Sequence, residues 1–487
     1  MRSVSLIRNK SIFAYFVLIP TFIFNIRNIL FPLNYQQDDV AELEPIFFDS
    51  FICAFDWGDQ HPLFSGFVWT LGQLIEFPEY LVSFFILGTS ILSVILFHNI
   101  LSKQFDNNLA LLGGIFLVTS PTFITYSVSL KQYSFEIFCS LLCLKFLQER
   151  NKDTLSINAI VIYSVSFSIL FLFSFVNGLV IFFLILFLLK EKNLKLILSF
   201  SVFAVLLFFF QSNLLSKIER VSQGGYWDNF FLNTSSIEKF LNSFYFLNQL
   251  YLKSIISLFI HPLMTFILFA AILVVFFKRN NIINFSVVLI MSLYILSSLS
   301  LYPLGGGRTD ILFLPFGIIL IINLISYFIN DLVNLKNKQI LTVPIIILLF
   351  FSVTLLKPYY KNENITPLLN EISELYNSSE AAIVTTEEQS HAFLYYSQKL
   401  YDLGRLPDKG CSVRINIDNL FIQKDNENLD VINQVKEYPE VVLIGIELPN
   451  TQGQYRIVSK QLLEENYYIV DEKIFPGYVK AVYFNRE

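Results

Sequence analysis

The sequence predicts a polytopic α-helical membrane protein that ends in a small α/β domain. Of its 487 residues, 54% are hydrophobic and 15% are charged, whereas a soluble domain carries about 25% charged residues. The apolar residues come in blocks of roughly 17–24 residues, the length that crosses a bilayer as a helix. From about Pro358 these blocks shorten and polar residues fill in. We therefore expect a transmembrane domain at 1–357 and an extracytoplasmic α/β domain at 358–487.

The hydrophobic blocks predict about eleven membrane-spanning helices. They lie near 11–33, 80–101, 109–127, 133–149, 157–174, 176–190, 194–212, 254–277, 281–303, 310–331 and 341–357. The first block has no small-residue cleavage site, so we expect a membrane helix there and not a removed signal peptide. The run 62–77 is amphipathic and either lies in the membrane interface or extends the second helix.

Lys and Arg residues in the short loops predict the orientation, because cytoplasmic loops carry an excess of them. They gather at one set of alternate ends: Arg2, Arg8, Lys10, Lys103, Lys145, Arg150, Lys152, Lys190, Lys192, Lys195, Lys278, Arg279, Lys336 and Lys338. The opposite side receives the acidic loop 34–62, the long loop 213–253 and the C-terminal domain. We expect a cytoplasmic N-terminus and a periplasmic or extracellular C-terminal domain.

In the C-terminal domain, short strands alternate with helices, a pattern typical of an α/β layer fold. Helices are expected at 366–376, 387–400 and 459–465, strands at 381–385 and 441–446, and a closing hairpin at 467–474 and 479–484. The domain shows no phosphate loop, nucleophile elbow or metal motif. The chain has no basic stripe or recognition motif for nucleic acid.

The four cysteines have no metal-site spacing. Cys139 and Cys143 lie four residues apart on an apolar helix, where small core residues are expected. Cys53 and Cys411 could face an oxidising compartment and pair with each other.

The acidic loop after the first span holds the candidate catalytic residues, Asp38 and Asp39. A carboxylate at that membrane boundary can act as a general base towards an acceptor hydroxyl or amine, or hold a metal that binds a phosphate. Most acidic loops are simply solvated, so the other carboxylates of the loop are weaker candidates. These are Glu42, Glu44, Asp49, Asp56 and Asp59. His61 precedes the helix start Pro62 and either caps that helix, ligates a metal or contacts a phosphate.

Two cations on the outer side break the positive-inside pattern and suggest binding of a donor phosphate. Lys131 and Tyr133 could bind a lipid phosphate, or Lys131 could snorkel to anionic headgroups. Glu136 needs a partner inside a membrane helix, and we expect Lys131 or Arg308. The guanidinium of Arg308 matches phosphate oxygens, and the N–H groups of Gly305–Gly307 favour an anion. The alternative is a tight turn in which Arg308 pairs with Asp310.

These motifs, in this order and on one side of the membrane, resemble those of the GT-C-type membrane glycosyltransferases. The resemblance rests on the Asp38-Asp39 pair, His61-Pro62-Leu63, Lys131-Gln132-Tyr133 and the Tyr302-Pro303 to Arg308 turn, and it covers roughly residues 1–357. It is greatest to bacterial members of the protein O-mannosyltransferase and aminoarabinose-transferase-like superfamily. The sequence departs from the family pattern in lacking a second Pro after His61 and in having Asp39 where Glu is commoner.

The resemblance implies an inverting hexosyl- or pentosyltransferase of a bacterial inner membrane. Its donor would be a polyprenyl-phosphate-linked sugar, its acceptor a lipid, glycan or protein reached from the outer face, and its catalytic carboxylate Asp38 or Asp39. It leaves open whether a divalent metal ion takes part. Two other classes remain: a transporter or flippase of lipid-linked sugars, and a polysaccharide polymerase or ligase.

Overall fold

The computed structural model describes most of the chain. The described residues are 14–26, 43–48, 50–57, 61–75, 78–127, 129–150, 157–189, 200–210, 228–256, 267–275, 280–305, 307–329, 366–375, 380–386, 393–397, 405–408, 412–415, 417–423, 430–446, 454–475 and 479–486. The chain forms two compact units. Unit 1 comprises Met1–Asn28, Gly58–Phe64 and Ser83–Tyr359, and unit 2 comprises Ile29–Trp57, Ser65–Val82 and Tyr360–Glu487.

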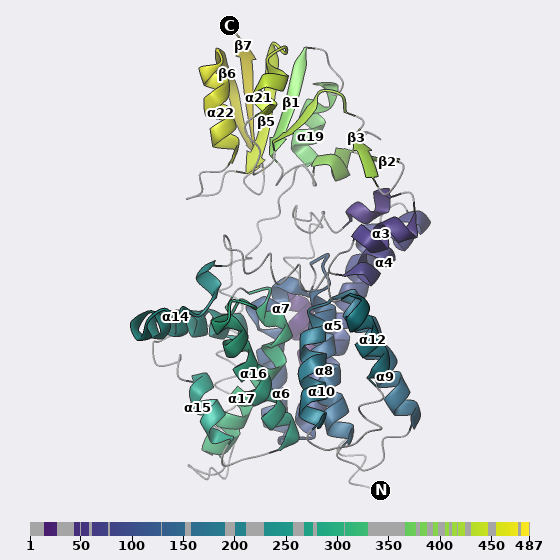
Figure 1. Cartoon of the computed structure of the whole chain (residues 1–487), viewed down its shortest axis with the longest axis vertical. Helices are drawn as coiled ribbons and strands as arrows, with labels where there is room; N and C mark the ends of the chain where they lie inside the picture. Colours follow the sequence, from purple (N-terminus) through teal and green to yellow (C-terminus); the bar gives the residue numbers. More distant parts are fainter. Residues whose placement is uncertain are drawn as a thin grey trace. The chain divides into compact units, whose positions relative to one another are not determined.

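Unit 1 is helical. Its described helices include Ala14–Ile26, α6 (Asn107–Val118), α7 (Pro121–Tyr126), α8 (Tyr133–Arg150), α9 (Ile157–Phe173), α10 (Asn177–Leu189), α12 (Ser201–Phe209), α14 (Ile237–Ile255), α15 (Ile267–Val274), α16 (Asn281–Ser298), α17 (Leu314–Tyr327) and most of α5 (Pro78–Ser102). Within it, α17 packs against α6, α8, α15 and α16, and α8 packs against α9 and α10 (Figure 1). Among the described helices, α5 and α16 are long and apolar enough to cross a membrane, and several others are apolar but shorter.

The expected span 109–127 is two helices and not one. Proline lacks the backbone N–H that a helix interior needs, so Pro121 starts a new helix, α7. The hydroxyl of Ser120 accepts the N–H of Phe123 at 3.2 Å and donates to the carbonyl of Ser254 at 2.5 Å. The break therefore also fastens the end of α14 to this part of unit 1. The last expected span, 341–357, lies outside the described residues.

The expectation of a loop at 213–253 is wrong for its second half, which forms most of helix α14. Ser236 caps this helix by accepting the N–H of Lys239 at 3.2 Å, and apolar residues then recur every three to four positions. In Figure 1, α14 runs crosswise to α16 and α17. A helical period without a long unbroken apolar block explains why hydropathy alone did not identify it.

The run 62–77 forms a helix of its own, α4 (Pro62–Leu74), and does not extend α5. Glycines on α4 allow close packing of the preceding segments in unit 2, η1 (Glu44–Phe47) and α3 (Phe51–Trp57). A Cβ at Gly66 would lie 2.6 Å from the Phe51 ring, and one at Gly72 would lie 2.6 Å from Ile46.

The C-terminal part of unit 2 is a mixed five-stranded sheet in the order β4-β1-β5-β7-β6. Its strands are β1 (Ala381–Thr386), β4 (Leu420–Gln423), β5 (Glu440–Ile446), β6 (Tyr467–Phe475) and β7 (Val479–Arg486). Strands β4, β1 and β5 are parallel, and β7 pairs antiparallel with both β5 and β6. The expected strands and closing hairpin are thus confirmed, whereas β4, helix α21 (Asp430–Val435) and the hairpin β2 (Arg405–Asp408) and β3 (Ser412–Ile415) were not expected.

Both faces of this sheet are covered, because side chains alternate along each strand. On one face, Val441 and Leu443 join the core formed with α21 and α22 (Gln454–Glu464). On the other, Val442 and Ile444 pack with α19 (Thr366–Ile372) and the helical residues 393–397. The result is a three-layer α/β/α arrangement, as the alternation of helices and strands predicts.

Part of the predicted outer loop folds with this C-terminal region in unit 2. The ring of Phe47 lies 6.1 Å from the ring of Tyr395, and the Tyr395 hydroxyl donates to the buried Glu79 carboxylate at 2.7 Å. Cys53 is disulfide-bonded, whereas Cys139 and Cys143 are free and buried. The remaining cysteine of the sequence, Cys411, lies outside the described residues.

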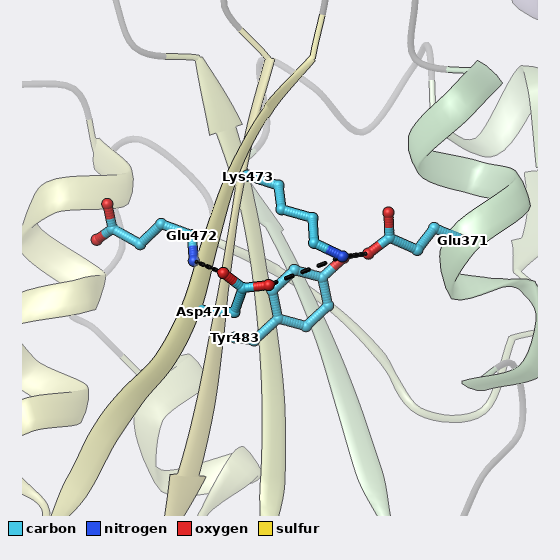
Figure 2. A network of polar contacts seen from close by, with 5 residues as sticks. All are labelled: Glu371, Asp471, Glu472, Lys473 and Tyr483. Carbon is cyan, nitrogen blue, oxygen red and sulfur yellow. Dashed lines mark hydrogen bonds and ion pairs between the residues drawn. The ribbon is translucent and has the colours of Figure 1, made fainter.

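An exposed polar network joins α19 to the β6–β7 hairpin (Figure 2). The Lys473 ammonium pairs with the Glu371 carboxylate, and the Tyr483 hydroxyl donates to the same oxygen at 2.7 Å. Lys473 also lies 3.7 Å from the Asp471 carboxylate. Hydrogen bonds from Lys473 and then Tyr483 hold the pKa of Glu371 below its ordinary value of 4.5.

Glu371→Gln is expected to lower the free energy of unfolding at neutral pH by about 0.5 kcal/mol, as for other exposed ion pairs. Because the folded pKa lies below the unfolded one, this contribution is present above pH 4.5 and is lost as pH falls through the folded pKa. Thermal unfolding of the full-length protein, followed by circular dichroism, measures the difference between wild type and variant. That difference should shrink towards zero in acid.

The matched control is Glu374→Gln, which removes an exposed carboxylate outside this network. Its effect at neutral pH should be smaller than that of Glu371→Gln. A Glu371→Gln effect that stays constant from neutral to acidic pH would show that the network does not act through the Glu371 charge.

Candidate active site

The turn between α16 and α17 is shaped by the buried carboxylate of Asp310. Its two oxygens accept the N–H groups of Gly305 at 2.9 Å and Gly307 at 3.2 Å. Both glycines have positive φ, at +79° and +67°, a backbone conformation that residues with a Cβ rarely adopt. The expectation that these amides bind an external anion is therefore wrong for Gly305 and Gly307, because the turn supplies its own carboxylate. Arg308, the other phosphate contact expected in this turn, is half-buried beside them.

Two further hydrogen bonds hold the same turn. The Tyr302 hydroxyl donates to the carbonyl of Thr309 at 2.9 Å, and the N–H of Leu304 donates to the carbonyl of Phe230 at 2.8 Å. Helix α16 ends at Ser298, before Pro303, and Ser300 adopts a positive φ of 56° where the chain leaves the helix. Arg308 is thus displayed from a turn that is fixed on both sides.

The predicted residues Lys131, Tyr133 and Glu136 lie at the start of α8. Tyr133 is the first residue of the helix, and Lys131 precedes it in a half-buried turn. Glu136 is 2% exposed and accepts a hydrogen bond from the Ser174 hydroxyl at 2.7 Å. Ser174 stands between α9 and α10, so the buried carboxylate also joins three helices. Ser174 was not expected from the sequence as a partner of Glu136.

The start of α8 and the Asp310 turn meet in space, although about 170 residues separate them. The Ser140 hydroxyl of α8 donates to the carbonyl of Leu312 at 2.6 Å. The Tyr302 hydroxyl lies within electrostatic reach of Glu136, Asp310 and Tyr133. The ring of Tyr126 packs edge-on against that of Tyr133, at 4.7 Å between centroids. We call Tyr126, Tyr133, Glu136, Tyr302 and Asp310 the tyrosine–carboxylate cluster.

His61 approaches this region through aromatic packing. Its ring lies 5.9 Å from that of Phe64, which in turn lies 6.3 Å from Phe135 and 6.5 Å from Phe173. Phe135 immediately precedes Glu136 on α8. His61 itself is 9% exposed, just before α4. The structure therefore brings His61 towards the first turn of α8, with Phe64 between them.

The predicted catalytic residues Asp38 and Asp39 lie outside the described residues, as do Glu42, Asp49 and Asp59. Within the described part of the chain, no three His, Cys, Asp or Glu side chains are grouped as a metal site would require. A divalent metal at Asp38 and Asp39 therefore remains an expectation from the sequence.

Sequence reasoning missed the role of Asp310, which it considered only as a partner for Arg308. The signal was present: Asp follows Gly305 by five residues and Gly307 by three, at the start of the short helix η4 (Asp310–Leu312). An Asp side chain there can turn back to amides of the preceding loop. Tyr126 carried no comparable signal, because it lies within an apolar run.

No protein-family model matches the chain, and no curated protein matches its sequence.

The positive-φ glycines give a matched pair of variants. Gly305→Ala would place Cβ 2.7 Å from Cβ of Leu250 and 3.2 Å from the carbonyl of Leu247, whereas at Gly307 the nearest atom, the Tyr126 hydroxyl, lies 3.8 Å away. In both variants the left-handed conformation of alanine should lower the free energy of unfolding by about 1–2 kcal/mol. Overpacking should lower it by about 1–3 kcal/mol more in Gly305→Ala. Thermal unfolding of both proteins measures the difference. Equal losses would contradict the packing of Gly305 against α14.

Proposed function

We propose that the protein is a membrane glycosyltransferase that moves a sugar from a polyprenyl-phosphate donor to a lipid, glycan or protein acceptor. The observation that carries the proposal is the meeting of two cation-bearing motifs, Lys131 to Glu136 and Tyr302 to Asp310, at one place in unit 1. Each motif was proposed from sequence to face a donor phosphate. The Ser140 to Leu312 hydrogen bond and the shared electrostatics of Tyr302 support their acting together.

Several features support a membrane setting. Helices α5 and α16 have the length and composition of membrane spans. Large apolar side chains also stand exposed on the helices of unit 1, as at Phe84 (69%) and Phe209 (71%), where a soluble protein would normally bury them. The disulfide of Cys53 favours an oxidising compartment for the loop after the first span. The proposal puts this loop, the tyrosine–carboxylate cluster and the C-terminal domain on the outer side of a bacterial inner membrane.

The reaction is an inverting displacement at the anomeric carbon of the sugar. The acceptor oxygen or nitrogen attacks that carbon from the face opposite the phosphate and forms the new glycosidic bond. The bond between the anomeric carbon and the phosphate oxygen breaks, and its electron pair leaves with the polyprenyl phosphate. Asp38 or Asp39 takes the proton that the acceptor loses. No oxidant or reductant is needed.

The cations stabilise the negative charge that develops on the leaving phosphate. Arg308 supplies a planar fork matched to two phosphate oxygens, and Lys131 supplies a point charge. Tyr133 offers a phenol near the same place, and Glu136 helps to hold the first turn of α8 through Ser174. The His61 ring packs against the Phe64 ring, and from there His61 can orient the start of α4 or reach a phosphate.

Comparison of cell-surface glycans with and without the protein tests this function. Mass analysis should show loss of one glycosyl residue from a surface lipid, glycan or protein when the protein is absent, while the lipid-linked sugar accumulates on the outer face. Accumulation of the lipid-linked sugar on the inner face would instead indicate a flippase. Loss of long polysaccharide with all single units intact would indicate a polymerase. Either of these outcomes would overturn the proposal.

A further inference from the structure

Helix α14 is amphipathic along its whole length, but only its C-terminal half is covered by protein. Leu247, Tyr251, Leu252 and Ile255 are buried. The Tyr251 hydroxyl donates to the carbonyl of Phe313 at 3.0 Å, and Asn248 accepts a hydrogen bond from Tyr294 of α16. This half is therefore anchored to α16 and to the start of α17.

The N-terminal half continues the same apolar face beyond the protein. Ile237, Leu241 and Tyr245 follow one another at four-residue steps, in line with Asn248 and Leu252 of the buried half. They are 81%, 57% and 37% exposed. Phe240 and Phe244 lie beside them with stacked rings, 5.9 Å apart. An uncovered face of this size needs an apolar environment.

The opposite face of α14 is polar and carries two cations. Glu238, Lys239, Asn242 and Lys253 are exposed along it, with Phe246 as the apolar exception. Helix α16 also exposes apolar side chains, Met291 and Ile295, and so does the residue that follows it, Leu299. The ring of Phe244 lies 5.4 Å from that of Tyr294, which joins the two surfaces.

We propose that the N-terminal half of α14, residues 237–246, lies in the membrane interface and binds the lipid surface. Its crosswise direction relative to α16 and α17 is the one required of a helix in the interface plane (Figure 1). Ile237, Leu241 and Tyr245 insert among the acyl chains, while Lys239 and Lys253 reach the phosphate headgroups. Aromatic residues at this level suit the boundary between acyl chains and water. The inference needs unit 1 to be embedded in a membrane, but it is independent of sugar transfer.

Single-cysteine labelling of the full-length protein tests this placement. Leu241→Cys and Asn242→Cys are adjacent and both exposed, and they lie about 100° apart around the helix, on its apolar and its polar side. Each is labelled with a bimane fluorophore in nanodiscs of phosphatidylcholine and phosphatidylglycerol, with the unsubstituted protein measuring background labelling. Quenching by lipids brominated near the headgroup end of the chain should be about twofold or more greater at position 241, because the apolar face of an interfacial helix sits about 5–10 Å inside the headgroup boundary. Iodide in the water should quench the label at position 242 more strongly.

A second pair, Ile237→Cys and Lys239→Cys, repeats the test if either of the first variants does not fold. The proposal is overturned if the two labels of a pair are equally accessible to iodide, which would place the helix in water. It is also overturned if the label at position 241 or 237 is shielded from both lipid and iodide, because another protein segment would then cover this face.

Discussion

Replacing Asp38 and Asp39 together by Asn is expected to reduce transfer by between about a hundredfold and ten-thousandfold, the range of a lost general base. Asn keeps the size of the side chain but cannot accept the acceptor's proton. The measurement is kcat/KM for transfer from a polyprenyl-phosphate sugar by purified protein in lipid vesicles. Insertion into the membrane should be unchanged, because the substitutions make the loop less polar and leave every apolar block intact.

The single variants Asp38→Asn and Asp39→Asn then identify the base, since only one of them should reproduce most of the loss. Glu464→Gln is the control, because it removes an exposed carboxylate of the C-terminal region that pairs only weakly, at 3.9 Å, with Lys460. An active double variant would refute the assignment.

Arg308→Ala is expected to lower kcat/KM by about a hundredfold to a thousandfold, as when a donor to a developing negative charge is removed. The Asp310 carboxylate, and not Arg308, accepts the N–H groups of Gly305 and Gly307, so these two hydrogen bonds do not depend on the Arg308 side chain. Arg308→Lys keeps the charge but loses the planar fork, and we expect it to fall between wild type and Arg308→Ala. Thermal unfolding of both variants measures any accompanying loss of stability.

The kinetic pattern separates a role in catalysis from one in structure. Loss of transition-state stabilisation lowers kcat, whereas loss of uniform binding raises KM alone. The phosphate of the polyprenyl-phosphate donor is the leaving group, so we expect Arg308→Ala to lower kcat for transfer from this donor. Full activity in Arg308→Ala would show that the phosphate is bound elsewhere.

The broad division of the chain was predictable because hydropathy is a property of long segments. The sequence predicted a helical N-terminal region and a C-terminal sheet, and the strands near 381–385 and 441–446 appear as expected, since each is an apolar run bounded by polar residues. Strand β4 and the β2–β3 hairpin were missed because each has only four residues and little alternation. Short segments are defined by their neighbours more than by their own pattern.

Local breaks and amphipathic helices were harder to predict than apolar blocks. Ser120-Pro121 divides an apolar run that hydropathy treats as continuous. Helix α14 has a clear helical period but too many polar residues to form a hydrophobic block. The packing of Phe47 and Glu79 with Tyr395 joins segments more than 300 residues apart in the chain, and no local pattern encodes such a pairing.

The candidate site was predictable residue by residue but not contact by contact. The sequence identified Lys131, Glu136 and Arg308 as candidates because placing a charge in a membrane costs free energy. The Ser174 partner of Glu136 carried no such signal, since it is one of many serines in the helices. The use of the Gly305 and Gly307 amides by Asp310 became evident only from the folded turn, and it shifts the proposed phosphate contact onto the Arg308 side chain.

A single-turnover reaction measures whether this chain transfers a sugar from a polyprenyl phosphate. Purified full-length protein in lipid vesicles is mixed with hexosyl and pentosyl polyprenyl phosphates and a pool of surface lipids, glycans and proteins. Mass spectrometry follows the lipid, and nuclear magnetic resonance gives the configuration of the product. We expect equal amounts of free polyprenyl phosphate and glycosylated acceptor, with inversion at the anomeric carbon. Movement of intact donor across the vesicle membrane, with no free polyprenyl phosphate formed, would contradict it.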